Sequence, residues 1–179
     1  YTEKNGFKPK IIFVQGVGMF ACGGTKKEAE TASVVFEDAI KIATYAMSFG
    51  GAKHMSEELT AFISNWEVES YRARVALSGA TDKRLAGKIS IVTGSAQGFG
   101  AGIAEAMIRE GAYVAIADMN VEGAENMAKS LCEKYGKGVA FPVYVNVTDE
   151  NSVREMIKKT VFEYGGLDVF VNNAGIVRA

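Results

Sequence analysis

Hydrophobic and polar positions follow two different patterns along the 179-residue chain. Near the start, a short apolar run at 11–14 precedes a glycine-rich stretch, and apolar residues then recur at helical spacing over 26–49. A second stripe with the same spacing begins near Ser56 and runs through Tyr71 toward Val75. This part of the chain is therefore predicted to form a strand, a turn and two helices, with Thr25 and Glu28 as a capping box.

The pattern changes after a small, polar stretch at 78–84, which we interpret as a domain junction. Beyond it, apolar runs alternate with helical patterns. Strands are expected at 89–93, 113–117, 139–145 and 167–172, and helices at 98–110, 121–135 and 149–164. Such alternation predicts right-handed βαβ units. We therefore expect an α/β fold, a partial doubly wound parallel sheet of Rossmann type that stops after its fourth strand, with domains at 1–80 and 81–179.

Two glycine-rich stretches follow predicted strands, "VQGVGMFACGG" at 14–24 and "VTGSAQGFGAG" at 92–102. No second βαβ strand with a terminal acid follows the first stretch, so it is interpreted as a structural turn. In the second, Gly94 permits a tight turn, while Gly98 and Gly100 let backbone approach a diphosphate at a helix N-terminus. The next predicted strand ends at Asp118, where a carboxylate can bind an adenosine ribose.

Composition and charge exclude several classes of protein. The formal net charge is −1, so nothing indicates nucleic acid or an anionic membrane as a partner. No apolar run approaches the roughly 20 residues of a membrane span, and no signal peptide opens the chain. Cys22 and Cys132 are far apart and are expected to be reduced thiols in a cytoplasmic protein. His54 is the one histidine, and no metal site is expected.

Four segments together resemble the short-chain dehydrogenase/reductase family: "GKISIVTGSAQGFG", "AIADMN", "VNVTD" and "GGLDVFVNNAG". The resemblance covers about residues 84–179. It implies an oxidoreductase that moves hydride between a nicotinamide cofactor and a small-molecule carbonyl or alcohol. It also implies a cofactor loop made of Gly94, Ser95, Gln97, Gly98, Phe99 and Gly100.

The same resemblance implies the rest of the cofactor site. Asp118 would hold the adenosine ribose, and Asn146 and Val147 would flank the adenine. Many family members have Asp where Asn146 stands, but an amide oxygen can still accept a hydrogen bond from the adenine amino group. The segment Asn173, Ala174 and Gly175 would lie along the cofactor and also tie neighbouring strands together.

The expected cofactor is NAD. Gln97 stands in the glycine loop where a basic residue could be, and Met119 and Asn120 follow Asp118. None of the three carries a positive charge that would offset repulsion between Asp118 and a 2′-phosphate.

Catalytic residues are not assigned. The family's chemistry uses a Ser and a Tyr-x-x-x-Lys, and no tyrosine of this chain has a lysine four residues later. We therefore expect that these 179 residues hold a cofactor half-site and show no turnover alone, and that the parent protein is the enzyme.

Residues 7–77 resemble the end of a class II aldolase-like domain of the kind fused ahead of a reductase in bifunctional rhamnulose-phosphate aldolase/alcohol dehydrogenases. The reductase halves of such proteins resemble sorbitol-6-phosphate 2-dehydrogenase, which implies a sugar, a polyol or their phosphates as substrate. Two other interpretations stay open: a non-catalytic dinucleotide-binding module, and a structural α/β domain without a ligand. The strand at 167–172 would leave an open sheet edge, which a second copy of the chain or the N-terminal segment is expected to cover, and a homo-oligomer is therefore expected.

Overall fold

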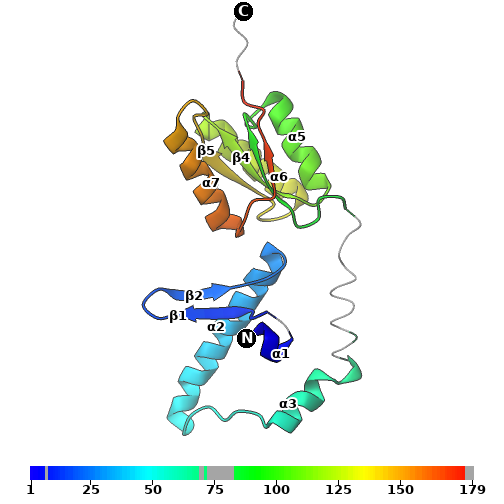
Figure 1. Ribbon diagram of the computed structural model, residues 1–179, viewed down its shortest axis with the longest axis vertical. Helices are drawn as coiled ribbons and strands as arrows, with labels where there is room; N and C mark the ends of the chain where they lie inside the picture. Colours follow the sequence, from blue (N-terminus) through cyan, green and yellow to red (C-terminus); the bar gives the residue numbers. More distant parts are fainter. Residues whose placement is uncertain (7, 69–70, 72–82, 176–179) are drawn as a thin grey trace, which may run out of the picture. The chain divides into compact units, whose positions relative to one another are not determined.

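The computed structural model describes residues 1–6, 8–68, 71 and 83–175. The chain divides into two compact units, Tyr1–Ala80 and Thr81–Ala179. Figure 1 shows the helices and strands of each unit. Most of the predicted junction at 78–84 lies outside the described residues, as does the predicted helical stretch from 72 to 75.

The first unit begins with the single-turn helix α1 (Thr2–Asn5), and a β-hairpin follows it. Strand β1 (Ile11–Val14) pairs antiparallel with β2 (Gly18–Ala21), with Ile11 opposite Ala21. The turn between them uses Gly16 at φ 77°, a conformation that glycine adopts without strain. The interpretation of 14–24 as a turn is therefore wrong over Gly18–Ala21, because these residues form a second strand.

Three helical elements follow the hairpin in the described part of the first unit: α2 (Lys26–Ala46), the 3₁₀ turn η1 (Met47–Phe49) and α3 (Glu57–Ser64). The capping box forms with one difference. The Thr25 hydroxyl accepts the Glu28 N–H at 3.2 Å, but the Glu28 carboxylate accepts the N–H of Gly24 rather than that of Thr25, at 3.0 Å. Helix α3 ends at Ser64 and the described residues 67, 68 and 71 are helical again, so the helix expected to run through Tyr71 is interrupted after Ser64.

The first unit has no core of its own among its described residues, none of which is buried. Its apolar contacts are local, such as the Phe13 and Phe36 rings at 5.3 Å between the hairpin and α2. Large apolar side chains stay exposed, including Phe49 at 89% and Trp66 at 53%. The described part of this unit is therefore held by secondary structure and partial packing rather than by buried side chains.

A four-stranded parallel sheet forms the second unit, as the alternating pattern predicts. Its strands are β3 (Ile89–Thr93), β4 (Tyr113–Asp118), β5 (Ala140–Tyr144) and β6 (Val169–Val171). Their order is β5-β4-β3-β6, and all three pairings are parallel. The connecting helices are α5 (Gly98–Arg109), α6 (Val121–Tyr135) and α7 (Glu150–Tyr164).

Apolar residues on the two faces of the sheet form two separate clusters. On one face, Val92, Val114 and Ile116 pack with residues of α5 and α6 such as Ala104 and Leu131. On the other face, the β3–β5 residues Ile91, Ala115 and Val143 pack with Met156 of α7. The sheet is thus covered on both faces, with α5 and α6 on one side and α7 on the other (Figure 1). This layering is the Rossmann-like α/β arrangement, and it leaves the carboxyl ends of the strands free to carry a site.

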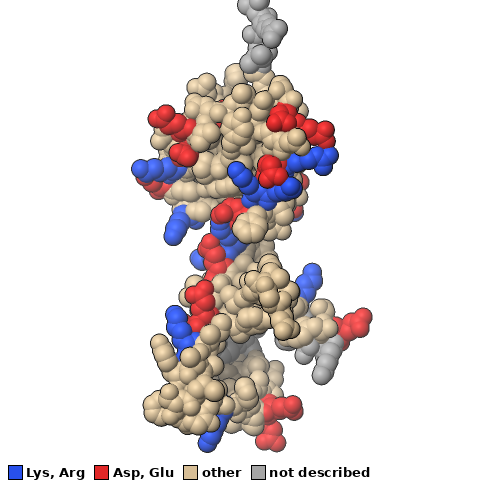
Figure 2. Space-filling view, turned by 90° about the vertical axis from the view of Figure 1, so that its left-hand side faces the viewer, with Lys and Arg blue, Asp and Glu red and all other residues tan. Residues whose placement is uncertain are grey.

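Acidic and basic side chains are mixed on the face seen in Figure 2. In the part of the chain that the structure describes, no helix combines the length and the apolar character needed to cross a membrane.

Candidate functional site

The glycine loop connects β3 to α5 at the carboxyl edge of the sheet. Gly94 has φ 67° and Gly98 has φ 62°, so both positions need a residue that tolerates the left-handed region. A Cβ at Gly100 would lie 2.1 Å from the Gly94 carbonyl oxygen. Gly100 is therefore required because the first turn of α5 rests directly on the loop that precedes it.

Ser95 fastens the loop to the sheet. Its side chain is fully buried, and its hydroxyl donates to the Val92 carbonyl at 2.6 Å and accepts the Ala117 N–H at 3.0 Å. The Gly94 N–H also donates to the Ala117 carbonyl, at 2.7 Å. The loop therefore continues the hydrogen bonding between β3 and β4 past the last residue of β3.

Asp118 lies at the carboxyl end of β4 and contacts the same loop. One carboxylate oxygen accepts the Ala96 N–H at 3.1 Å, and the other accepts the Asn120 N–H at 3.0 Å. Each oxygen has a second lone pair, because a carboxylate accepts about four hydrogen bonds. The carboxylate can thus hold the loop and still accept bonds from a vicinal diol.

Thr93 and Asn173 connect the loop to β6. The Thr93 hydroxyl donates to the Val171 carbonyl at 3.3 Å and accepts the N–H groups of Asn173 and Ala174, both at 3.0 Å. The Asn173 amide donates to the carbonyls of Thr93 at 2.9 Å and Gly94 at 3.3 Å. Asn173 therefore ties neighbouring strands together, which is the structural half of its expected role.

The loop after β5 lies beside Asp118, since the Val145 N–H donates to the Asp118 carbonyl at 3.0 Å. In this loop, the Asn146 side-chain oxygen accepts both the N–H of Thr148 at 3.1 Å and its hydroxyl at 2.8 Å. The oxygen expected to accept from an adenine amino group is thus already engaged. The geometry therefore does not support the expectation that the Asn146 oxygen accepts a hydrogen bond from an adenine amino group.

The predicted site residues come from four loops at one edge of the sheet. Thr93, Ala96 and Thr148 belong to the same network but were not predicted as site residues. A threonine that ends an apolar strand just before a glycine is the sequence signal that could have identified Thr93. Phe99, at 90% exposure, and Val147, at 42%, present apolar surface next to the polar groups of these loops.

The N-cap of α5 differs from the N-caps of α6 and α7 at the same edge of the sheet. The N-cap side chains of α6 and α7, Asn120 and Asp149, accept backbone N–H groups of their own helices. Gln97, the N-cap of α5, makes no such side-chain bond. The N-terminus of α5 therefore keeps its positive dipole end uncompensated by its own cap, which suits an anion.

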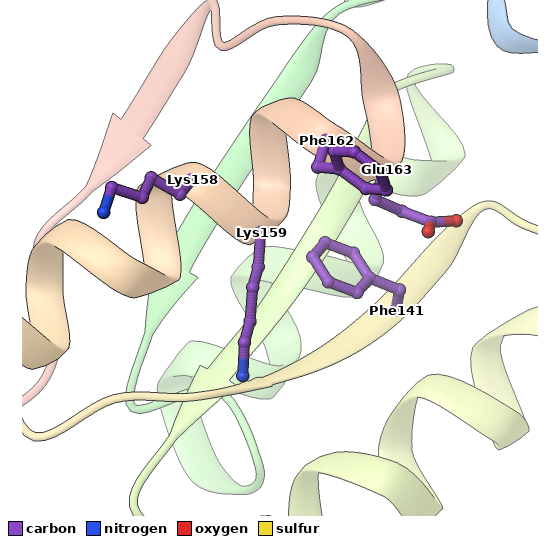
Figure 3. A pocket seen from close by; sticks show the side chains of 5 residues that line it. All are labelled: Phe141, Lys158, Lys159, Phe162 and Glu163. Carbon is purple, nitrogen blue, oxygen red and sulfur yellow. The ribbon is translucent and has the colours of Figure 1, made fainter. Parts of the chain in front are cut away.

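A hollow of about 390 Å³ lies elsewhere, between α7 and β5 (Figure 3). It is lined by Phe141, Lys158, Lys159, Phe162 and Glu163. Phe141 is near the start of β5, and the other four belong to the second half of α7. Because α7 returns toward the amino ends of the strands, this hollow is not part of the loop cluster at their carboxyl ends.

No group of three or more His, Cys, Asp or Glu side chains able to hold a metal ion occurs within residues 1–6, 8–68, 71 and 83–175. The histidine His54 lies in the segment between η1 and α3.

Two family models match the chain, one for each unit. A family model described as short chain dehydrogenase matches residues 88–179, just over half of the chain. The chain belongs to the short chain dehydrogenase family. A second model, described as aldolase class II, second domain, matches residues 3–72 of the same chain. The resemblances expected for both parts of the sequence are confirmed.

Two curated relatives match different shares of the chain. The uncharacterized oxidoreductase YuxG of Bacillus subtilis is 31% identical over 168 residues, which cover 94% of this chain and 24% of YuxG, so the similarity extends across both matched regions. The 15-hydroxyprostaglandin dehydrogenase [NAD(+)] of Macaca fascicularis is 39% identical over 90 residues, covering 50% of this chain and 34% of the relative. The chain spans about a quarter to a third of these relatives.

Among solved structures, sorbitol-6-phosphate 2-dehydrogenase SrlD from Erwinia amylovora is similar to half of the chain. The two share 33% sequence identity with a TM-score of 0.49, over 50% of this chain and 35% of SrlD. The family match at residues 88–179 spans all four strands of the parallel sheet, β3 to β6.

Proposed function

We propose that residues 81–179 are the NAD-binding half of a dehydrogenase that transfers hydride between the nicotinamide cofactor and a sugar, a polyol or their phosphates. In this proposal, residues 1–80 are the C-terminal remnant of an aldolase-like domain within the same cytoplasmic, homo-oligomeric protein. The observation that carries it is the Asp118 carboxylate, held 3.1 Å from the Ala96 N–H of the glycine loop at the end of the neighbouring strand.

The dinucleotide would lie across the point where the strand order reverses. From β3 the sheet continues to β4 and β5 on one side and to β6 on the other, and dinucleotides bind at such a point. The N-terminus of α5 and the backbone of Gly98 to Gly100 would hold the diphosphate. Ser95 and Gln97 would shape that loop, while Asn173, Ala174 and Gly175 would line the nicotinamide side.

Asp118 would orient the adenosine ribose by accepting hydrogen bonds from its hydroxyls. A 2′-phosphate would bring like charge to within about 4 Å, which costs roughly 4 kcal/mol at an effective dielectric of 20. No compensating basic residue is present at Gln97, Met119 or Asn120. The name of the NAD(+)-dependent prostaglandin dehydrogenase relative supports the same preference for NAD.

The chemistry supplied at this site when the cofactor is bound is hydride transfer. The residues described here bind and orient; none of them is proposed to move a proton. No tyrosine of the chain has a lysine four residues later, so we propose that residues 1–179 alone bind the cofactor without turning over substrate. The same observation favours a second candidate, a non-catalytic dinucleotide-binding module. A full-length protein with a downstream Ser and Tyr-x-x-x-Lys would be the enzyme.

Calorimetric titration of NAD and NADP into the full-length protein tests the assignment. We expect NAD to bind at least about 10-fold more tightly, and Asp118→Ala to narrow this ratio because the like charge is removed. If Asp118→Ala only loosened the loop, the binding of NAD and of NADP would weaken equally. The ratio of the two affinities therefore separates loss of charge repulsion from loss of loop structure. Glu133→Ala is the control, since it removes the same charge from the exposed far end of α6. Equal or tighter NADP binding by the unmodified protein would refute the role of Asp118.

A further inference from the structure

The side-chain amide of Asn146 has a fixed orientation. Its oxygen accepts two hydrogen bonds from Thr148, one from the backbone N–H at 3.1 Å and one from the hydroxyl at 2.8 Å. A backbone N–H can only donate, so the group that faces it must be the oxygen and not the NH₂. The backbone of Asn146 is held as well, because its N–H donates to the Ser152 hydroxyl at 2.9 Å.

An amide oxygen has two lone pairs, and the two bonds from Thr148 use both. What Asn146 can still offer to a ligand is therefore its NH₂ group, which only donates. A carboxylate in the same place would differ, because its second oxygen would occupy the position of the NH₂ group and would only accept. Asn146 and its Asp counterpart thus present opposite hydrogen-bonding polarity in the same geometry.

The position of this amide relative to the proposed site follows from the sheet. The glycine loop, Asp118 and Asn146 follow β3, β4 and β5, which are consecutive in the sheet. The Val145 N–H is bonded to the Asp118 carbonyl, so the loop that carries Asn146 starts beside the ribose-binding carboxylate. A dinucleotide with its diphosphate on α5 and its ribose on Asp118 would direct its base toward this loop.

We propose that Asn146 offers the base of the dinucleotide only a hydrogen-bond donor, so the protein does not recognise the 6-amino group of adenine through this residue. The inference rests on the proposed function. The 6-amino group is a donor and finds no acceptor on Asn146, whereas the ring nitrogens of a purine and a 6-oxo group are acceptors. The site therefore tolerates hypoxanthine in place of adenine, and Asn146→Asp creates a preference for adenine.

The test compares NAD with nicotinamide hypoxanthine dinucleotide, which carries a 6-oxo group instead of the 6-amino group. Both are titrated by calorimetry into the full-length protein, unmodified and as Asn146→Asp. The substitution is isosteric and leaves one oxygen for both Thr148 bonds. Asn151→Asp is the matched control, because it adds the same charge at an exposed position five residues later, in the first turn of α7.

We expect the unmodified protein and Asn151→Asp to bind the two dinucleotides within about threefold of each other. Asn146→Asp is expected to favour NAD by about tenfold or more, which corresponds to about 1.4 kcal/mol. A strong preference for NAD in the unmodified protein, or no change in the ratio with Asn146→Asp, would overturn this inference and leave the proposed function standing. Failure of the unmodified protein to bind either dinucleotide would overturn the proposed function and this inference with it.

Discussion

Two buried serines of the parallel sheet have opposite hydrogen-bonding situations, and replacing each with alanine tests how the glycine loop is held. Ser95 donates to the Val92 carbonyl at 2.6 Å and accepts the N–H of Ala117 at 3.0 Å. Ser90, in β3, is equally buried, but its hydroxyl has no hydrogen-bond partner among the residues that the structure describes. The same chemical change is therefore expected to have different effects at the two positions.

The magnitudes follow from the bonds that are lost. A buried hydrogen bond contributes about 1 kcal/mol net, and a partner left unpaired costs about 1–3 kcal/mol. Ser95→Ala removes two bonds of a fully buried hydroxyl, while the Ala117 N–H keeps its strand-pairing bond toward β3, so we expect a loss of about 2 kcal/mol in the free energy of unfolding. Ser90→Ala removes a hydroxyl that makes no bond, so stability is expected to stay the same or to rise by up to about 1 kcal/mol.

The assay must report on the second unit. The chain has a single tryptophan, Trp66, which lies in the first unit, so tryptophan fluorescence would follow the wrong part of the molecule. Scanning calorimetry is suitable, because about 2 kcal/mol lowers the melting temperature of a domain of this size by roughly 10 °C. Hydrogen exchange of the Ala117 amide is more specific: it is expected to accelerate in Ser95→Ala and not in Ser90→Ala. Equal stability of the two variants, or an unchanged Ala117 exchange rate, would refute the reasoning.

Two further predictions concern the loop and the strand ends. Gly100→Ala is expected to abolish dinucleotide binding in titration, because its Cβ would lie 2.1 Å from the Gly94 oxygen. Gly102→Ala in the same helix meets no atom within 4 Å and is expected to raise the free energy of unfolding by about 0.5–1 kcal/mol. Similar behaviour of the two variants would contradict this prediction. The hydrogen bond from the Ile89 N–H at 2.9 Å lowers the pKa of Asp168, and the nearby Lys88 lowers it further. The ionised carboxylate therefore stabilises the fold above its unfolded-state pKa, which is near 4. This contribution is lost as the pH falls through the lower folded-state pKa. Asp168→Asn is therefore expected to lower the urea midpoint at pH 7 and to have a smaller effect at pH 2.5, and an equal effect at both pH values would count against it.

The second unit could be predicted from the sequence nearly residue by residue, because its strands are buried on both faces. A run such as 113–117 therefore appears as a continuous apolar segment, and amphipathic helices separate the strands. Strand β2 was missed for the opposite reason. Gly18–Ala21 is short, begins with glycine and is partly exposed, so only its pairing with β1 makes it a strand.

The candidate site was predictable as a set of positions but not as a set of hydrogen-bonding groups. The spacing of Gly94, Gly98 and Gly100 and the acid that ends β4 are visible in the sequence. Which atom of Asn146 is free is not visible, because it depends on how the loop brings Thr148 back onto the amide oxygen. Sequence patterns identify the residue types at a site, whereas the direction of donation depends on the folded geometry.

The two backbone N–H groups held by Asp118 have a kinetic consequence for ligand exchange. Ala96 and Asn120 are fixed by the carboxylate before any ligand arrives, so the entropy of ordering this part of the loop is lost during folding and not during binding. Association then needs no slow rearrangement of the loop, and its observed rate is expected to rise linearly with ligand concentration. Differences in affinity between ligands would then arise from their dissociation rates, that is, from how fast each dinucleotide leaves the preordered loop.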